Sequence, residues 1–459
     1  MKTRLTRAFL TLSLILFALP IMSQDWMVVH FKNGTTRKFY LENVTEIVAS
    51  KNDSEGSTHS NYLYQHITTL YNKYVYAIED IDSISFTKYN EDVVIQNIAS
   101  ATDAIEIAIQ NCNTIDDIKP KLDEINKIDG IEKAWIGGNQ LFVKIKGWEK
   151  IAYVFSGEDT IIDEEDFINE ARSIVPRYKS SSNNTKLRAV IANQQYRDEA
   201  KEKSFRKKYE DLVSDFDKCG IEALILDGPD IQFFRSNSDD LEKRRNMYDY
   251  DIVFVRTHGG SDPVTDENGN KDETATTHSI VSSEDLGIQG TVLWRDAISS
   301  LRSLRPEDCS DDHIYLSGNH ETRNKEQVVV YHPGLSELFF SEIADGKFQN
   351  PNSLLFMGAC ATLEDNFNFA KLFVGEGNKN LGSYWGYDKS EARAGYAGID
   401  FLSGILKGKS QYLSYTDLES KYKTETGVEG ANLLRWPSIE ENTQMYIIPT
   451  ITKETENQK

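Results

Sequence analysis

The stretch Asp251-Ile252-Val253-Phe254-Val255-Arg256-Thr257-His258-Gly259-Gly260 decides the fold expected for the chain. Its continuous apolar segment is typical of a strand that is buried on both faces of a sheet. Two similar runs precede it, at residues 187–192 and 221–227, and an amphipathic helix pattern at residues 202–218 separates them. This alternation predicts a parallel sheet that is covered by helices on both sides.

The same alternation continues in the second half of the chain. Residues 353–357 predict a fourth strand and residues 382–386 a fifth, with helices expected at residues 239–247, 366–375 and 391–407. Ligands bind such sheets at the carboxyl ends of the strands. The residues that follow each strand are therefore the first candidates for function.

Two smaller modules are expected before this domain. Residues 24–88 alternate like strands around the hairpin signal Asn33-Gly34, which predicts a β-rich module. Residues 89–178 predict a small α/β module, and residues 179–186 (KSSSNNTK) lack periodicity, as linkers do. The main α/β domain is then expected to cover residues 187–450.

Within the small module, a helical pattern runs from Ile105 to Ile125 and leads to Gly130. Residues 134–136 and 141–145 follow as two strands of a predicted hairpin. These patterns predict a helix and a hairpin. No residue types that suit catalysis come together in them.

Residues 1–23 have the features of a secretory signal peptide. Three basic residues precede the apolar run 8–20, which ends near the small residue Ser23. This run is shorter than the roughly 20 apolar residues of a spanning helix. The sequence therefore predicts export to the periplasm, the cell surface or the medium, with no membrane span in the mature protein.

The overall charge and the cysteine content exclude some functions. The formal net charge of −21 is opposite to that needed to bind phosphate backbones, so nucleic acid is not an expected partner. Four cysteines are too few for a disulfide scaffold in a chain of 459 residues. The sequence does not indicate an oligomeric state.

Two strand ends carry residues that suit thiol catalysis. The strand at residues 251–256 is followed by Thr257-His258-Gly259-Gly260, and the strand at residues 353–357 by Gly358-Ala359-Cys360-Ala361. If these ends are neighbours, Cys360 can attack a carbonyl and His258 can protonate the leaving amine. The backbone amides of Gly259 and Cys360 would stabilise the oxyanion, and the small Gly358 and Ala359 would admit substrate.

An apolar strand ending in His-Gly, followed about a hundred residues later by a strand ending in small-small-Cys, resembles the clan CD cysteine peptidases. This group includes the caspases, legumain, clostripain, the gingipains and separase, and the segment VFVRTHGG is most similar to the clostripain and gingipain branches. The resemblance covers about residues 187–450. It implies a caspase-like fold and an endopeptidase that cleaves polypeptides through an acyl-thioester, with His258 and Cys360 as catalytic residues and Gly259 in the oxyanion hole.

The sequence departs from that group at the substrate pocket. Clostripain-like members carry an acidic residue two positions before the cysteine, and this chain has Gly358 there, so no preference for Arg or Lys at P1 is predicted. Three acidic residues of later loops could line the pocket in its place: Glu364, Asp365 and Asp388. The segment SYWGY at residues 383–387 resembles the segment that lines the P1 pocket in this group, so Tyr384 and Trp385 are candidates for the pocket. The same segment is equally typical of a buried strand.

Other interpretations stay open. Cys360 can be a small buried apolar residue and His258 a hydrogen-bonded strand end, which would make the chain an inactive caspase-fold binding or cell-surface protein. A transpeptidase or ligase could use the same two residues. Residues 24–180 could also be a pro-region that is removed near the linker.

No metal site is predicted. The stretch Asp266-Glu267-Asn268-Gly269-Asn270-Lys271-Asp272 has oxygen ligands at alternate positions, but its glycine is misplaced for an EF-hand and the distal glutamate is missing. The stretch is therefore interpreted as a solvated loop. Calcium is suggested only by the resemblance to clostripain, and no other cofactor is expected.

Overall fold

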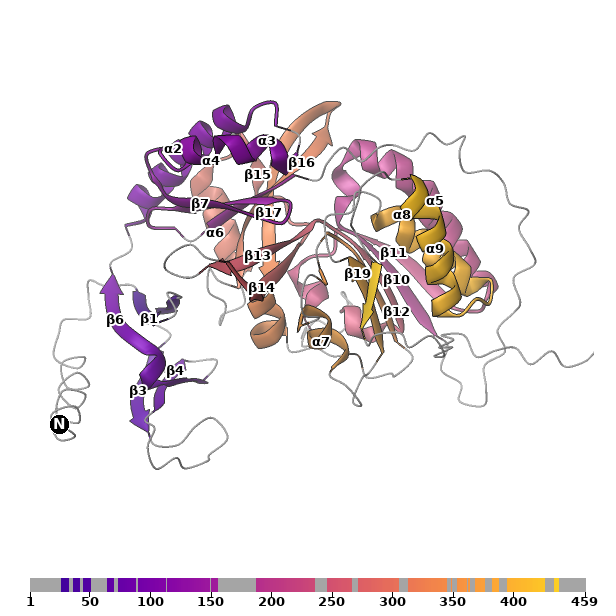
Figure 1. The fold of residues 1–459 in the computed structure, drawn as a ribbon, viewed down its shortest axis with the longest axis horizontal. Coiled ribbons are helices and arrows are strands. Elements are labelled where there is room, and N and C mark those ends of the chain that lie inside the picture. The colour runs from indigo at the N-terminus through magenta and orange to yellow at the C-terminus, as the bar shows by residue number, and fades with distance from the viewer. Residues whose placement is uncertain are drawn as a thin grey trace, which may run out of the picture.

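The computed structural model describes residues 26–32, 36–41, 44–50, 64–69, 73–87, 90–112, 114–148, 150–155, 187–235, 246–265, 271–304, 313–344, 348, 353–360, 362–363, 368–375, 382–387, 394–425 and 433–436. Within these ranges the chain has a mixed α/β architecture with two large sheets (Figure 1). The predicted signal peptide and linker lie outside the described residues.

The first large sheet has six strands in the order β11-β10-β12-β18-β19-β20. All neighbours are parallel except β20, which is antiparallel to β19. The order reverses between β10 and β12, and such a switch point is where open α/β sheets bind ligands. The strands are β10 (Arg188–Asn193), β11 (Glu222–Asp227), β12 (Ile252–Arg256), β18 (Leu354–Gly358), β19 (Ser383–Tyr387) and β20 (Leu433–Trp436).

Helices cover both faces of this sheet. On one face, alternate residues such as Phe254 and Phe356 share a core with α5 (Glu199–Lys218), α8 (Ala394–Leu406) and α9 (Gln411–Glu425) (Figure 1). The opposite face packs on shorter elements. These are η6 (Ile231–Phe234), the π-helical turn η8 (Phe339–Ala344) and α7 (Asn368–Val374). The helix α6 (Trp294–Leu304) instead contacts Tyr331 of the second large sheet.

Local sequence explains how α5 forms. Asp198 precedes the helix, and its side chain accepts hydrogen bonds from the backbone N–H groups of Ala200 and Lys201, which have no partner inside the helix. Phe205 and Tyr209 then recur at helical spacing on the buried face. Short 3-10 turns accompany the strands, η5 (Gln194–Arg197) after β10 and η7 (Met247–Asp249) before β12.

The second large sheet curls and has the order β13-β14-β17-β16-β9-β8-β7, with β15 paired to β17. Its strands come from two distant parts of the chain. Three belong to the small module and five to the main domain: β7 (Ile131–Gly137), β8 (Gln140–Ile145), β9 (Lys150–Val154), β13 (Gly259–Thr265), β14 (Lys271–Val281), β15 (Gly287–Ile288), β16 (Ile314–Arg323) and β17 (Glu326–Ser336).

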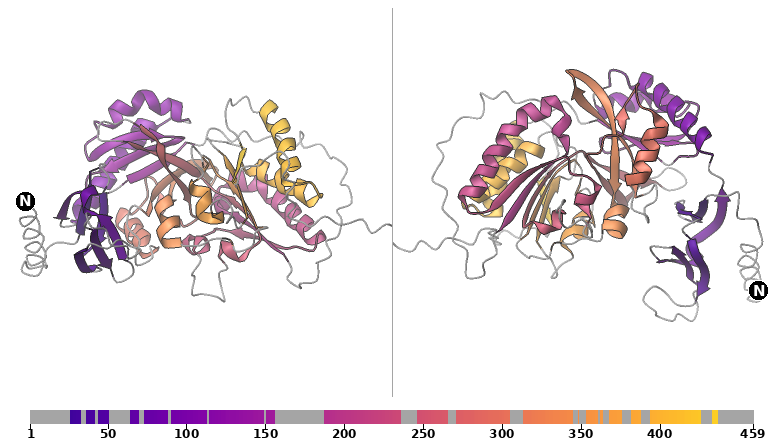
Figure 2. Two further views of the ribbon diagram at one scale, coloured as in Figure 1. Left: turned by 60° about the horizontal axis from the view of Figure 1, so that its bottom comes forward. Right: turned by 180° about the vertical axis from the view of Figure 1, so that it is seen from behind.

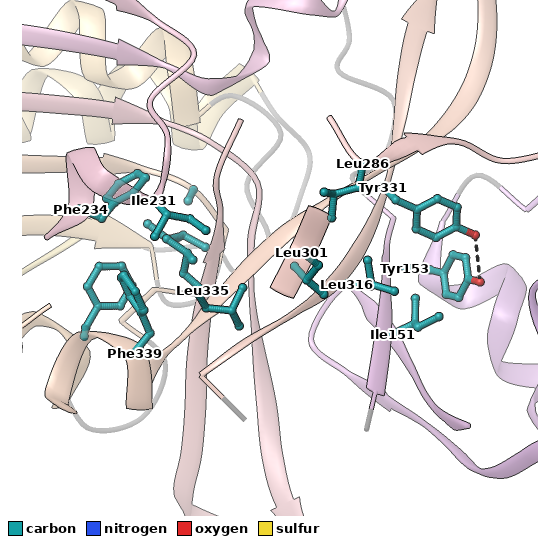
Figure 3. Close-up of a cluster of buried hydrophobic side chains, with 14 of the residues drawn as sticks. Ile151, Tyr153, Ile231, Phe234, Leu286, Leu301, Leu316, Tyr331, Leu335 and Phe339 are labelled. Atoms are coloured by element: carbon teal, nitrogen blue, oxygen red, sulfur yellow. Dashed lines mark hydrogen bonds between the residues drawn. The ribbon is translucent and has the colours of Figure 1, made fainter. Parts of the chain in front are cut away.

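The seam between the two parts lies between β9 and β16. These strands are parallel, with Ile151 opposite Leu316 and Val154 opposite Asn319. Figure 3 shows the buried side chains around this seam, where the hydroxyls of Tyr153 and Tyr331 are 3.3 Å apart. One continuous apolar core therefore joins the small module to the main domain.

The helices of the small module are shorter than predicted. The expected pattern from Ile105 to Ile125 is divided among α2 (Glu91–Ile109), α3 (Ile115–Ile118), η3 (Lys119–Lys121) and α4 (Leu122–Ile125). The break follows α2 at Asn111, whose φ of 67° does not continue a right-handed helix. Ile107, which lies within the predicted helical pattern, is 75% exposed and does not contribute to the buried face.

The β-rich module contains two three-stranded sheets, β2-β1-β6 and β3-β4-β5. It contacts the main domain through Arg37, which pairs with Glu342, while His313 Nε2 lies 3.2 Å from the same Glu342 oxygen. In Figure 2 the module lies at one end of the molecule. Its elements are β1 (Trp26–Phe31), β2 (Thr36–Tyr40), β3 (Val44–Ser50), β4 (Tyr64–Thr69), β5 (Lys73–Ala77), η2 (Ile78–Asp80) and β6 (Ile81–Thr87).

The parallel-sheet prediction is confirmed at the level of strands and covering helices. Each predicted strand between residues 187 and 386 has its counterpart within one or two residues. The helix expected at residues 239–247 falls mostly outside the described residues. Among the described helices, none is both long enough and apolar enough to cross a membrane.

Candidate active site

The strand ends that carry His258 and Cys360 are neighbours. β12 and β18 are adjacent parallel strands, and their last residues, Arg256 and Gly358, are directly opposite each other. The backbone N–H of Thr257 donates to the carbonyl of Gly358 over 3.3 Å, which extends the pairing by one residue. His258 and Cys360 each follow two residues after the matched pair, so both lie at the carboxyl rim of one sheet.

Gly259 brings the histidine segment into contact with the cysteine segment. A β-carbon on Gly259 would lie 2.8 Å from the carbonyl oxygen of Cys360 and 2.9 Å from the β-carbon of Ala359. Both distances are shorter than van der Waals contact, so only glycine allows this close approach. Of the residues predicted for catalysis and the oxyanion hole, Gly259 and Cys360 are therefore in direct contact.

His258 lies at the passage from one large sheet to the other. β12 ends at Arg256 and β13 begins at Gly259, so the histidine is the last residue before the chain enters the curled sheet. Its carbonyl accepts hydrogen bonds from the Val281 backbone N–H at 3.1 Å and from the Thr257 hydroxyl at 3.2 Å. These contacts fix the backbone that carries the imidazole.

The imidazole of His258 is almost fully enclosed, with 4% of the residue exposed. Its Nε2 atom is buried and has no hydrogen-bond partner among the described residues. Burial lowers the pKa of His258 well below its ordinary value, and the positive charges of Lys201 and Arg256 lower it further. The ring is therefore neutral near pH 7.

Cys360 differs from the other described cysteines in its surroundings. Met357 and Ala359 belong to the large apolar cluster, whereas Cys360 is buried, with 8% of the residue exposed, but belongs to neither of the two clusters that cover the sheet. Cys219 is packed in the core that the sheet shares with α5, α8 and α9, where its thiol donates to the Leu406 carbonyl over 3.7 Å. Burial raises the pKa of Cys219 to about 11, which makes that thiol unreactive.

The pocket candidates lie in or next to the sheet. Gly358 ends β18, and the side chain of Ala359 packs in the core beneath it. In β19, Tyr384 packs in the core of one face and Trp385 in the core of the other, where the indole donates to Gln411 over 2.9 Å. Both rings are fully buried, which is the arrangement that the buried-strand interpretation describes.

Other candidates lie outside the described residues. These are Ala361, Glu364, Asp365, Asp388 and most of the loop at residues 266–272. In the described ranges, no group of three or more His, Cys, Asp or Glu residues is arranged to hold a metal ion.

A buried ion pair near the site had no signal in the sequence. Glu321 accepts from His332 Nε2 over 2.7 Å and also pairs with Arg323. Burial alone would raise the pKa of Glu321, but these two partners together lower it below its ordinary value. The contact between Glu321 and His332 joins β16 and β17.

Neither the protein-family models nor the curated proteins with which the chain was compared provide a match. The two strand ends, with the motifs that they carry, are therefore the features from which a function can be inferred.

Proposed function

We propose that this protein is a secreted cysteine endopeptidase of clan CD with a caspase-like fold, closest to the clostripain and gingipain branches. One observation carries the proposal. His258 and Cys360 follow matched residues of adjacent parallel strands, and Gly259 contacts the Cys360 carbonyl. Histidine, glycine and cysteine then share the rim where α/β sheets bind ligands.

In the proposed reaction, the neutral His258 accepts the thiol proton as the Cys360 sulfur attacks the peptide carbonyl. The backbone N–H groups of Gly259 and Cys360 stabilise the negative charge that develops on the carbonyl oxygen. His258 then passes its proton to the amine as the C–N bond breaks, which leaves an acyl-thioester. Water hydrolyses the thioester, releases the carboxylic acid and restores the thiol.

The low pKa of His258 is consistent with this order of proton transfers. An imidazole that is uncharged at rest can act first as a base, and once protonated it is a strong acid toward the leaving amine. The imidazole would therefore be largely neutral before substrate binds. A pre-formed thiolate–imidazolium pair is not part of the proposal.

The pairing within the curled sheet affects whether the small module can be released after proteolytic cleavage. Because β9 pairs with β16 and shares a core with the main domain, removal of residues 89–155 would expose a strand edge and a large apolar surface. We therefore expect that cleavage between residues 156 and 186 leaves the two pieces associated. The earlier possibility of a discarded pro-region then applies at most to the β-rich module.

A second candidate function is a caspase-fold protein that binds partners without turnover. The enclosure of both side chains favours it, since an active dyad must be reached by substrate. The two candidates differ in one respect: only a peptidase requires the sulfur of Cys360 for its effect on peptides.

A peptide-library digest tests the proposal. The wild-type protein should cleave a subset of the library, and Cys360→Ala should lose at least about a thousandfold in rate, as loss of a nucleophile does. Cys219→Ala serves as the matched control, and it should keep its activity because that thiol lies in the apolar core. Equal cleavage by wild type and Cys360→Ala would contradict the proposal, and an inert wild type would favour the binding protein.

A further inference from the structure

The turn between β7 and β8 contacts the chain directly after His258. This turn belongs to the small α/β module, and Gly138 has a φ of 53°, which allows its tight bend. A β-carbon on Gly138 would lie 2.9 Å from the Ser261 hydroxyl oxygen. The turn is therefore packed on the start of β13, three residues after the candidate catalytic histidine.

Gln140 makes the closest of these contacts. It is the first residue of β8, and its carboxamide occupies the space that a β-carbon on Gly260 would need. Gly260 in turn follows Gly259, which contacts Cys360. A continuous line of contacts thus runs from Gln140 through the His-Gly-Gly segment to the candidate nucleophile.

The polar side-chain atoms of Gln140 make no hydrogen bond that would stabilise the fold within the described residues. The residue is 1% exposed, and neither its Oε1 nor its Nε2 has a hydrogen-bond partner among the described residues. A carboxamide offers two donors and an acceptor with two lone pairs, and enclosing it without partners is costly. Sites that keep such unpaired groups are often functional, because the cost is recovered when a ligand binds.

Two further polar side chains share this face of the curled sheet. Gln140 is opposite Val154 and Val154 is opposite Asn319, so the three residues form one row across β8, β9 and β16. Ser317 lies two residues before Asn319 and faces the same way. Asn319 Oδ1 and Ser317 Oγ are also buried without partners in the described part of the chain. These side chains offer both donors and acceptors, and Glu321 and His332, which pair with each other, face the same way farther along the strands.

We propose that Gln140 binds the main chain of the polypeptide substrate, so that the small module supplies part of the substrate site. The inference rests on the proposed peptidase function and names the module's contribution to it. The edge of an extended peptide presents N–H and C=O groups that match the two ends of a carboxamide. Because Gln140 is enclosed, the peptide has to part the β7–β8 turn from Gly260 as it enters.

Gln140→Met is the most informative variant. It keeps the length and volume of the side chain and removes its donors and acceptor. If Gln140 binds substrate, KM for a cleaved library peptide should rise about tenfold, equivalent to about 1.4 kcal/mol, while kcat stays within about twofold. Tm should stay the same or rise, because a buried unpaired amide has been removed. Modification of Cys360 by iodoacetamide should be unchanged, which shows that the dyad is intact.

Asn126→Ala is the matched control in the same module. The Asn126 carboxamide is fully used, since it donates to the Leu122 and Ala134 carbonyls and accepts from the Ala134 N–H. This variant should lose stability and keep the wild-type KM. An unchanged KM in Gln140→Met, or a Tm lowered as in Asn126→Ala, would overturn the proposal and assign Gln140 a structural role.

A binding measurement separates this inference from the proposed function. The probe is the peptide library itself, bound to Cys360→Ala with and without Gln140→Met. Retention by Cys360→Ala that falls about tenfold with Gln140→Met supports the inference even if the wild type proves inert, in which case only the peptidase proposal fails. Equal retention by the two proteins, or no retention by Cys360→Ala, would overturn the inference.

Discussion

The two large sheets differ in how their strands are gathered from the chain. The six-stranded sheet takes its first three strands from residues 188–256, with the helix α5 between β10 and β11. The curled sheet joins residues 131–154 to residues 259–336 across a parallel seam. His258 lies at the step from one sheet to the other. The first sheet carries the candidate dyad, while the second begins at Gly259, holds the His258 carbonyl through the Val281 N–H and depends on the small module for three of its strands.

The largest effect is expected where the two sheets meet. Gly259→Ala would place a β-carbon 2.8 Å from the Cys360 carbonyl oxygen and 2.9 Å from Ala359. Displacing the Gly259 amide should lower peptidase activity by roughly 100-fold or more, the effect of losing one oxyanion donor, and overpacking should reduce stability by about 1–3 kcal/mol. Peptide hydrolysis and urea unfolding measure the two effects.

Gly290→Ala is the control for that substitution. Among the described residues, no atom lies within 4 Å of a β-carbon at Gly290, so only its φ of 79° opposes the change. A cost of about 1 kcal/mol with full activity is expected. If Gly259→Ala behaves like Gly290→Ala, the two strand ends are not as close as this account requires.

The next effect tests whether the curled sheet is one unit. Ile151 is fully buried at the β9–β16 seam next to Leu316 (Figure 3). Ile151→Ala should reduce the free energy of unfolding by about 2–5 kcal/mol. Because the seam joins the small module to the main domain, both parts should unfold together in a single transition, as followed by circular dichroism and tryptophan fluorescence.

Ile107→Ala is the matched control, since it makes the same change in the same module at a side chain that is 75% exposed. Its stability should stay within about 0.5 kcal/mol of wild type. Two separate transitions, or an equal effect of the two variants, would show that the module folds apart from the main domain.

The smallest effect concerns pH. The pKa of His258 in the folded protein lies below its ordinary value of 6.5, so the unfolded chain binds the proton more readily. Stability should therefore fall as pH decreases from about 6.5 toward the folded pKa, by at most about 1.4 kcal/mol per pH unit for this group. His258→Gln should make the decline shallower, as measured by urea unfolding at several pH values.

His320 sharpens this test. Burial and the charge of Lys201 lower its pKa as well, so it contributes with the same sign. The double variant of His258→Gln and His320→Gln should show a weaker pH dependence than either single variant. A slope that His258→Gln leaves unchanged would mean that the imidazole is not enclosed in the folded protein.

The sequence predicted the first sheet well and the second sheet incompletely. Runs such as Ile252–Val255 are apolar throughout because both faces are buried, so they are recognisable without their neighbours. The pairing of β9 with β16 has no such signal, since strands about 160 residues apart leave no mark in local periodicity. The antiparallel strands between His258 and Cys360 were also not predicted, although β16 and β17 form a local hairpin around Asn324 and Lys325.

The candidate site also combines residues that local sequence predicts with residues whose positions depend on long-range packing. His258, Gly259 and Cys360 follow recognisable strands, so their shared rim could be inferred from order alone. Gln140 lies in an ordinary hairpin, and its position beside Gly260 depends on how the sheet curls. The full burial of Tyr384 and Trp385 likewise depends on packing from both faces of β19, which single-strand patterns do not specify.

The most direct test of the central claim is the reaction of a peptidyl acyloxymethyl ketone with the intact protein, followed by peptide mapping in a mass spectrometer. The account predicts one adduct, on the peptide that contains Cys360, formed at least about tenfold more slowly in His258→Ala. An unmodified Cys360, or an adduct whose rate does not depend on His258, would contradict it.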